Sequence, residues 1–431
     1  MTLAPTHPTQ SANLCESYAG ASQVIAAVLD GASLSDAIER HLRETPQGPS
    51  RSAVHDLSYQ TLRDFGWVHF IVNALVERPP SPAVVVALLY VALSDLQRDE
   101  RAYVVVDQAV RAVRLLGCHN AAGFVNGVLR NYVRRAEALR EAAAQDAMAT
   151  WRHPDWWIAE IRATYPHDWE AILAAGNQHP PMTLRVNQRR VTVTAYLDML
   201  ATSGHSARHL GDVAVRLDKP QPVTALPGFY EGHVSVQDSG AQRAAIYLSP
   251  LPGHRVLDAC AAPGGKTAHI LESVDCDLIA IDNDARRCQR INENLQRLGL
   301  HAKVLEGDAT VIGKWWDGKP FDRILADAPC SASGIVRRRP DIKWHRRARD
   351  LSKYAATQQS ILNTLWQVLA PGGKLLYSTC SLFKRENSAC IETFIHANRD
   401  VRAIDLAGLR HGQLLPSDDN DGFFYALLEK H

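Results

Sequence analysis

The stretch that decides the fold is Val256–Thr267, VLDACAAPGGKT. An apolar strand ending at Asp258 leads into a turn of small residues and glycines, and helical periodicity follows. Small residues in such a turn let the backbone approach a ligand closely. Asp282, at the end of the next predicted strand, lies 24 residues beyond Asp258, and a carboxylate so placed accepts both hydrogens of a ribose diol. The stretch therefore predicts an α/β domain with an adenosine-containing cofactor.

Two other interpretations of this stretch have to be weighed. Gly265-Lys266-Thr267 matches the end of the phosphate-binding pattern G-x-x-x-x-G-K-[ST], but Cys260 stands where that pattern requires its first glycine. This mismatch disfavours a nucleotide-hydrolysing site. A plain tight turn without a ligand is the second alternative.

The chain around this turn alternates between strands and helices. Five short apolar runs each end in a polar residue: His254–Asp258, Leu278–Asp282, Ala302–Glu306, Phe321–Asp327 and Gly373–Cys380. Such alternation predicts a parallel sheet with helices on both faces. Ligands bind beyond the carboxyl ends of such strands. We therefore expect Asp258, Asp282, Asp327 and Cys380 to lie along one rim.

The regions before this domain have a different character. Residues 12–148 show apolar residues at helical spacing in Ser22–Leu29, Ser52–Val76, Ser81–Leu96 and Val104–Leu116, and residues 1–148 hold 13 Arg against 15 Asp plus Glu. A strand at Thr183–Asn187 and a helix at Val193–Ser203 indicate a small α+β piece. We predict a helical domain (1–148), a small α+β subdomain (149–237) and an α/β domain (238–431).

Two further motifs place cysteines at strand ends. Ile324–Gly334 (ILADAPCSASG) contains Cys330, and Leu375–Ser381 (LLYSTCS), with Glu386-Asn387 five residues on, contains Cys380. A single strand-end cysteine is more often a packing residue, but two on one rim beside a cofactor turn indicate chemistry. No C-x-x-C pair or Cys/His cluster is present, so we expect no metal site. Spacing alone does not say which cysteine reacts.

At this point the chain resembles a known family. The blocks DACAAPGGKT, DAPCSASG and YSTCS are similar to RNA cytosine-5 methyltransferases, and FVNGVLR at Phe124–Arg130 is similar to the NusB-type RNA-binding fold. Together they resemble the bacterial 16S ribosomal RNA (cytosine-5) methyltransferases of type B, the Fmu/Sun family. The resemblance implies a Rossmann-like class I methyltransferase domain, preceded by an all-α NusB-like RNA-recognition domain and the small α+β subdomain.

The resemblance also implies an activity and a set of residues. S-adenosyl-L-methionine would be the cofactor, and C5 of a cytosine in 16S ribosomal RNA, usually numbered 967, the methyl acceptor. Cys380 would be the nucleophile that adds to C6, Cys330 would act in product release, and Asp327 would contact the base, the cofactor or both. The cofactor site would comprise Cys260, Ala261, Ala262, Pro263, Gly264, Gly265, Lys266, Asp282, Asp308 and Asp327.

The chemistry explains why such an enzyme needs a thiol. Cytosine C5 is too electron-poor to attack a methyl sulfonium, whereas addition of a thiolate to C6 makes C5 nucleophilic. An amino-methyltransferase would carry an aromatic residue where Asp327-Ala328-Pro329-Cys330 has a thiol, so that class is disfavoured. A non-catalytic RNA-binding assembly factor with the same fold is the second class of function. Methyl transfer to RNA distinguishes the two.

Charge and hydropathy bound the remaining possibilities. The net charge of +1 argues against a globally basic nucleic-acid coat, but Arg337–Arg349 holds seven Lys or Arg and one Trp, which predicts an RNA contact. The longest apolar run, Ala83–Leu93, is too short to span a membrane. The first ten residues lack the pattern of a secretory signal. We therefore expect a cytoplasmic protein, as a monomer.

Overall fold

The computed structural model of the 431-residue chain describes residues 9–45, 51–98, 101–409 and 411–431. The prediction that no secretory signal is present concerned the first ten residues, and most of these lie outside the described residues. The chain divides into two compact units, Met1–Gln178 with Val336–Arg346, and His179–Ile335 with Arg347–His431. No described helix is long and apolar enough to cross a membrane.

The first unit is helical throughout, as was predicted for residues 12–148. Its helices are α1 (Thr9–Leu29), α2 (Leu34–Glu44), α3 (Arg51–Arg63), α4 (Phe65–Leu75), α5 (Ala83–Leu96), α6 (Ala102–Leu115), α7 (Ala122–Ala143), α8 (Ala147–Trp151), α9 (Asp155–Thr164) and α10 (Trp169–Asn177). The longest apolar run forms α5, whose residues are mostly buried in the core of this unit. Its apolar character thus serves packing inside the bundle.

The segment Ser52–Val76, predicted to be helical, forms two helices, because α3 and α4 are separated at Asp64. This carboxylate is buried and accepts hydrogen bonds from Ser94 Oγ at 2.8 Å and Arg98 Nη2 at 3.1 Å. Arg152 Nη1 lies 3.1 Å from its other oxygen. A buried carboxylate is tolerated when it is paired, and here the pairing coincides with the break between the helices.

The basic segment predicted to contact RNA belongs largely to this helical unit. Arg337 and Lys343 are buried, and Lys343 lies in the short helix α15 (Ile342–His345). Lys343 Nζ donates to Arg152 O at 2.9 Å and to Asn177 Oδ1 at 2.8 Å. Burial holds the pKa of Lys343 well below its usual range. These two charges are therefore turned inward.

Trp344, expected to stack on an RNA base, also packs inside the unit. Its indole Nε1 donates to Leu62 O at 2.9 Å, and its ring meets Phe65 edge-on at 4.8 Å between centroids. His345 Nε2 lies 2.8 Å from Val28 O. The prediction that the segment contacts RNA through these residues was wrong, because the segment completes the core and hydrogen bonding of the helical unit.

The second unit begins with a small antiparallel sheet of strand order β2-β3-β1-β4. Its strands are β1 (Met182–Val186), β2 (Ala207–Gly211), β3 (Ala214–Leu217) and β4 (Val234–Val236), and α11 (Val193–Thr202) contributes Tyr196 and Leu200 to its core. The predicted strand and helix in this region are confirmed, with ends that differ by one residue.

The large sheet has the order β10-β12-β9-β8-β5-β6-β7, with β11 paired to β12. The five predicted strands are present as β5 (Arg255–Ala259), β6 (Asp277–Asp282), β7 (Lys303–Glu306), β8 (Phe321–Asp327) and β9 (Leu369–Thr379), all mutually parallel. A wholly parallel sheet was wrong, because β12 (Phe423–Lys430) runs antiparallel to β9, β10 (Val401–Ile404) and β11 (Gln413–Leu414).

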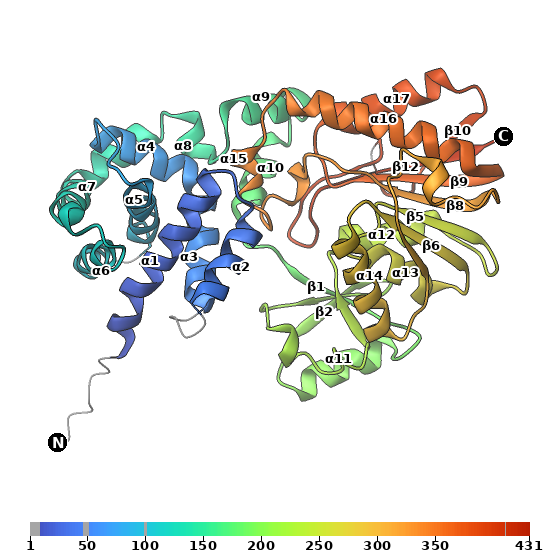
Figure 1. Ribbon diagram of the computed structural model, residues 1–431, viewed down its shortest axis with the longest axis horizontal. Helices are drawn as coiled ribbons and strands as arrows, with labels where there is room; N and C mark the ends of the chain where they lie inside the picture. The colour runs from blue at the N-terminus through green and yellow to red at the C-terminus, as the bar shows by residue number, and fades with distance from the viewer. Residues whose placement is uncertain (1–8, 46–50, 99–100, 410) are drawn as a thin grey trace. The chain divides into compact units, whose positions relative to one another are not determined.

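Helices cover both faces of this sheet, as predicted (Figure 1). On one face lie α12 (Ser239–Leu248), α13 (Gly265–Ser273) and α14 (Ala285–Leu298), and on the other α16 (Asp350–Val368) and α17 (Ser388–Ala397). Successive residues of β8 alternate between the two cores, since Ile324 packs with α16 and Leu325 with α12 and α13. Both faces of the strands are therefore apolar, and the polar residues of the predicted rim lie at the carboxyl ends of the parallel strands.

Candidate active site

The glycine turn lies between β5 and α13 and has an unusual backbone. Cys260 and Gly264 both have positive φ, 62° and 93°. A Cβ at Gly264 would lie 3.1 Å from Ile291 of α14, so glycine suits this position on steric grounds as well. The N–H of Ala262 donates to Asp282 Oδ2 at 3.1 Å. The turn is thus fastened to the end of the neighbouring strand.

A buried arginine binds both ends of α13. Arg185 of β1 donates to both carboxylate oxygens of Glu272 at 2.8 Å. The same guanidinium donates to Gly265 O at 2.7 Å and to Gln237 Oε1 at 2.6 Å. A bidentate pair with extra hydrogen bonds fixes geometry as well as charge. The small sheet therefore holds the first turn of the helix that follows the glycine turn.

A cavity of about 710 Å³ opens beside this turn at the carboxyl ends of the strands. Five of the ten predicted cofactor residues line it: Cys260, Ala262, Asp282, Asp308 and Asp327. The other five, Ala261, Pro263, Gly264, Gly265 and Lys266, form the turn and the start of α13 behind the lining. The volume suits a small-molecule cofactor.

Sequence reasoning missed several residues of this lining. They are Asn283, Arg287, Gly307, Ala309, Thr310, Pro329 and four residues of α16: Ala356, Thr357, Ser360 and Ile361. The α16 residues belong to no motif and reach the cavity only because the helix crosses the ends of the strands. No signal in the sequence distinguishes them from other helix residues.

The carboxylate of Asp258 lies fully buried at the end of β5. Thr267 Oγ1 donates to its Oδ2 at 2.6 Å, and its Oδ1 has no hydrogen-bond partner among the described residues. Burial raises the pKa of Asp258 to about 7, and the nearby Asp327 adds to the shift. Asp258 therefore holds a proton well above the pH at which an exposed aspartate loses it.

Asp327 connects the cavity to the thiols. Its Oδ2 lies 2.5 Å from Lys266 Nζ, and its Oδ1 accepts from Ser378 Oγ at 2.7 Å. Burial opposes the charge of Lys266, but the ion pair and hydrogen bond with Asp327 outweigh it and raise the lysine pKa. Lys266 thus stays protonated beside Asp327.

The two predicted cysteines meet. Cys330 Sγ and Cys380 Sγ are 3.5 Å apart, and neither forms a disulfide. The loops that carry them are tied together, since Ala328 N donates to Ser378 O at 2.9 Å and Gly334 N to Cys380 O at 2.8 Å. The shared hydrogen bond with Cys380 and burial raise the pKa of Cys330 well above its usual range. Either sulfur can donate the hydrogen bond that joins the pair.

Buried Glu386 holds the residues that follow both cysteines. Its carboxylate accepts from Ser331 N at 2.7 Å, Ser331 Oγ at 2.5 Å and Ser381 Oγ at 2.6 Å. Gln358 Nε2 donates more weakly, at 3.4 Å. Burial raises the pKa of Glu386, although these hydrogen bonds oppose the shift. The sequence placed a serine after each cysteine and Glu386 nearby, but gave no signal that they join.

Comparisons with known proteins bear on the family and on the fold. Family models match residues 245–429 (16S rRNA methyltransferase RsmB/F), 153–224 (RsmF/B-like ferredoxin-like domain) and 17–134 (NusB family). A relative named ribosomal RNA small subunit methyltransferase B, from Pseudomonas syringae pv. tomato, is 41% identical over 95% of this chain and 96% of its own length. One of the same name from Pseudomonas putida is 42% identical over 95% and 97%.

The chain belongs to the RsmB/F methyltransferase family. The predicted fold is thereby confirmed: a NusB-like helical domain, a ferredoxin-like subdomain and a methyltransferase domain. The crystal structure of PH0851 shares the fold, with a TM-score of 0.79 and 23% identity over 96% of this chain and 99% of that one.

S-adenosylmethionine is the cofactor of this methyltransferase domain. The residues around the cavity fit it. Each oxygen of Asp282 accepts one backbone N–H, from Ala262 at 3.1 Å and Asp284 at 3.3 Å, and a carboxylate oxygen has room for a further hydrogen. A ribose diol can therefore be bound there. No group of His, Cys, Asp or Glu suited to a metal ion occurs in the part of the chain that the structure describes.

Proposed function

We propose that the protein methylates C5 of a cytosine in 16S ribosomal RNA, at the position usually numbered 967, through a covalent bond between Cys380 and C6. The observation that carries the proposal is the 3.5 Å separation of the two sulfurs beside Asp327, which lines the cofactor cavity. The relatives' name, ribosomal RNA small subunit methyltransferase B, supports the choice of substrate.

The two thiols take different parts in the reaction. Cys330 keeps its proton, so its S–H donates to Cys380 and stabilises negative charge on that sulfur. A Cys380 thiolate adds to C6 and makes C5 nucleophilic, and S-adenosylmethionine, when bound, supplies an electrophilic methyl group. After methyl transfer, a base takes the proton from C5, the electron pair of that C–H bond re-forms the C5–C6 double bond, and the bond from C6 to Cys380 breaks to release the thiolate. The S–H of Cys330 again faces the departing sulfur.

Asp327 and Lys266 set the charge around the base. Lys266 pairs with Asp327 Oδ2, and Ser378, two residues before Cys380, donates to Oδ1. Asp327 is part of the cavity wall, so in this proposal its carboxyl group contacts the base or the cofactor, and the positive charge of its partner Lys266 offsets the negative charge pushed into the ring. Asp282 and Asp308 hold the cofactor in this proposal. The target cytosine must be single-stranded or flipped, since a stacked base hides C6.

The wider organisation is part of the same proposal. Residues 1–148 recognise RNA, residues 149–237 form the small subdomain, and residues 238–431 carry the chemistry. The protein acts as a monomer in the cytoplasm, where ribosomal RNA is found.

The test is transfer of a labelled methyl group from S-adenosylmethionine to 16S ribosomal RNA, followed by mapping of 5-methylcytosine. Cys380→Ala should abolish incorporation and leave cofactor binding within a few fold. Activity near wild type would remove Cys380 from the role of nucleophile. Cofactor binding without incorporation into any ribosomal RNA by the wild-type protein would favour the non-catalytic assembly factor.

A further inference from the structure

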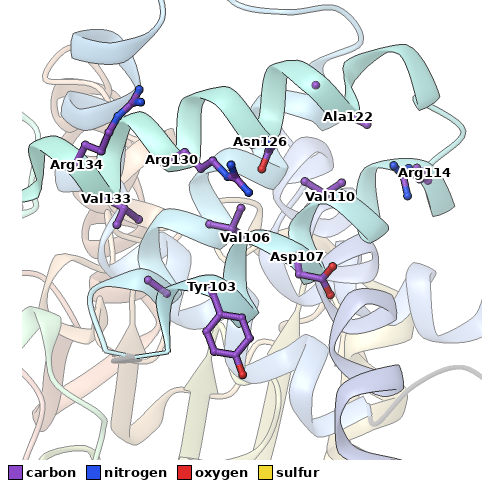
Figure 2. Close-up of a pocket in the computed structure, with 12 residues that line it drawn as sticks. Tyr103, Val106, Asp107, Val110, Arg114, Ala122, Asn126, Arg130, Val133 and Arg134 are labelled. Carbon is purple, nitrogen blue, oxygen red and sulfur yellow. The ribbon is translucent and has the colours of Figure 1, made fainter.

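The helical unit carries a groove that the proposed chemistry does not use. It runs between α6 and α7, has a volume of about 770 Å³, and is called the α6–α7 groove below (Figure 2). Its lining is Ala102, Tyr103, Val106, Asp107, Val110, Arg114, Ala122, Gly123, Asn126, Arg130, Val133 and Arg134. The floor is apolar and the rim is basic.

The groove concentrates positive charge in a region that is acidic as a whole. Arg114, Arg130 and Arg134 line it, and no described carboxylate pairs with any of them. Asp107, the one acid among the described residues of the lining, is engaged by Arg111 at 3.0 Å. In Figure 2 the guanidinium of Arg130 extends from α7 toward Val106 of α6. A cluster of unpaired guanidinium groups attracts an anion such as a phosphate.

Two glycines of α7 lie on the face of the helix that lines the groove, where a ligand could approach the backbone closely. Gly123 lines the groove, and Gly127 follows one turn later in the helix. A Cβ at either position would meet nothing within 4 Å. Each helix-interior glycine costs roughly 1 kcal/mol relative to alanine, and packing within the chain does not require it here. Bare backbone on this helix therefore suits an external chain that lies close to it.

An aromatic ring completes the edge of the groove. Tyr103 is 78% exposed, and its ring projects from α6 away from α7 (Figure 2). Tyr103 is the most exposed of the large hydrophobic side chains that the structure describes. Exposed rings beside arginines are the arrangement on which single-stranded nucleic acid binds, because bases stack on the ring while phosphates meet the charges.

We propose that the α6–α7 groove binds a single-stranded RNA segment, with phosphates on Arg114, Arg130 and Arg134 and a base on Tyr103. The inference rests on the proposed function only in that RNA is the substrate. The groove contributes affinity for RNA and no chemistry. An acidic polypeptide would satisfy the arginines but would leave the exposed ring of Tyr103 without a stacking partner.

The test uses the full-length protein and a labelled oligouridylate, which contains no cytosine and so cannot react. Its affinity is measured by fluorescence anisotropy over a series of salt concentrations. The triple variant Arg114→Gln, Arg130→Gln, Arg134→Gln should lower the slope of log affinity against log salt by roughly 2, because each phosphate contact on a single strand contributes roughly 0.7. Tyr103→Ala should weaken binding roughly five-fold or more, and Tyr103→Phe should restore it.

A matched variant controls for net charge. Arg40→Gln, Arg43→Gln, Arg78→Gln removes three exposed arginines of the same unit outside the groove and should leave the slope unchanged. Equal behaviour of the two triple variants, with both folded by thermal melting, would overturn the proposal. The proposal would also be overturned if the affinity for a labelled polyglutamate peptide required the groove arginines and the affinity for oligouridylate did not.

Methyl transfer separates this inference from the proposed function. At saturating ribosomal RNA the groove triple variant should turn over like the wild type and require only more RNA to reach half-maximal rate. An inactive wild-type protein would count against the proposed function and leave the oligouridylate result intact. If the wild type is active and the triple variant reaches half-maximal rate at the same RNA concentration, the proposal for the α6–α7 groove is wrong.

Discussion

Two consecutive stretches follow β8 and use their polar residues in opposite ways. Cys330–Gly334 brings a thiol, two serines and a glycine to the second cysteine loop. Val336–Arg346 contains more charge, but Arg337 and Lys343 are buried in the helical unit. Charge density along the chain therefore predicts a surface poorly. The position of a residue next to a strand end is easier to predict from the sequence, because the carboxyl ends of parallel strands lie along one rim.

The largest effect expected in the first stretch comes from Cys330→Ser. In the proposed mechanism the Cys330 thiol faces the sulfur that leaves C6, and a serine hydroxyl is a much weaker acid, so the substitution should slow release of the product far more than formation of the adduct. Turnover should fall on the order of 10³-fold, within the range for lost acid catalysis. A protein–RNA adduct should accumulate and survive denaturing electrophoresis.

The double variant Cys330→Ser, Cys380→Ala is the control for this adduct. It should show no adduct band, because the proposed nucleophile is gone. An adduct formed through Cys330 in the single variant Cys380→Ala would instead reverse the two roles.

In the second stretch, Trp344→Ala should destabilise the helical unit. The variant loses the packing against Phe65 and the hydrogen bond to Leu62 O, so a loss of about 3 kcal/mol is expected. Chemical unfolding followed by circular dichroism measures it. Trp344→Phe should recover part of the loss.

The same variant separates a structural role from an RNA contact. Below its unfolding temperature, Trp344→Ala should bind oligouridylate like the wild type. A large drop in RNA affinity with wild-type stability would restore the interpretation that Trp344 stacks on a base.

The same contrast shows which features of the fold could be predicted from the sequence and which could not. The five strands that carry the rim were predictable, because each is a short apolar run that ends in a polar residue. The antiparallel β12 was not, since nothing local fixes the direction in which Phe423–Lys430 pairs with β9. Likewise, Lys343 reads as a surface charge until its partners Arg152 and Asn177, distant in sequence, are known.

Within the site, residues named by motifs were easier to foresee than residues that act by support. Cys330 and Cys380 follow strands, so their meeting could be expected. Glu386 could not be assigned a role, because its three close donors come from two loops whose approach depends on the fold.

Glu386→Gln should sharpen this distinction between reacting and supporting residues. The amide keeps the size but accepts at only one atom, so one of the serine groups loses its acceptor, at a cost of roughly 1–3 kcal/mol. We expect adduct formation to slow about ten-fold, with cofactor affinity unchanged. The exposed Glu392→Gln in α17 is the matched control and should behave as wild type.

The pH profile distinguishes positioning from simple loss of stability. Because burial raises the pKa of Glu386, the wild-type carboxylate takes up a proton at a higher pH than an exposed glutamate does. The wild-type rate should therefore fall on the acid side, and the Gln variant should lack that fall. An unchanged acid limb in a folded Gln variant would assign Glu386 a structural role only.

The smallest effect is expected at Asp258, in the absence of cofactor. Its pKa is about 7 in the folded protein, whereas an unfolded chain releases this proton near the ordinary value of 3.8. Between these values the folded state binds more protons, so the stability from this group is fully present at low pH and is lost as the pH rises toward 7.

The variant Asp258→Asn tests this, because its side chain cannot titrate. Apart from the titration of Asp258, the difference in free energy of unfolding between the variant and the wild type does not depend on pH. Its free energy of unfolding relative to wild type should therefore rise on the order of 1 kcal/mol from pH 6 to pH 8, measured by urea unfolding. A relative stability that falls over this range would contradict the prediction, and one that stays flat would show that Asp258 is already ionised at pH 6 and that charges of its neighbours offset its burial.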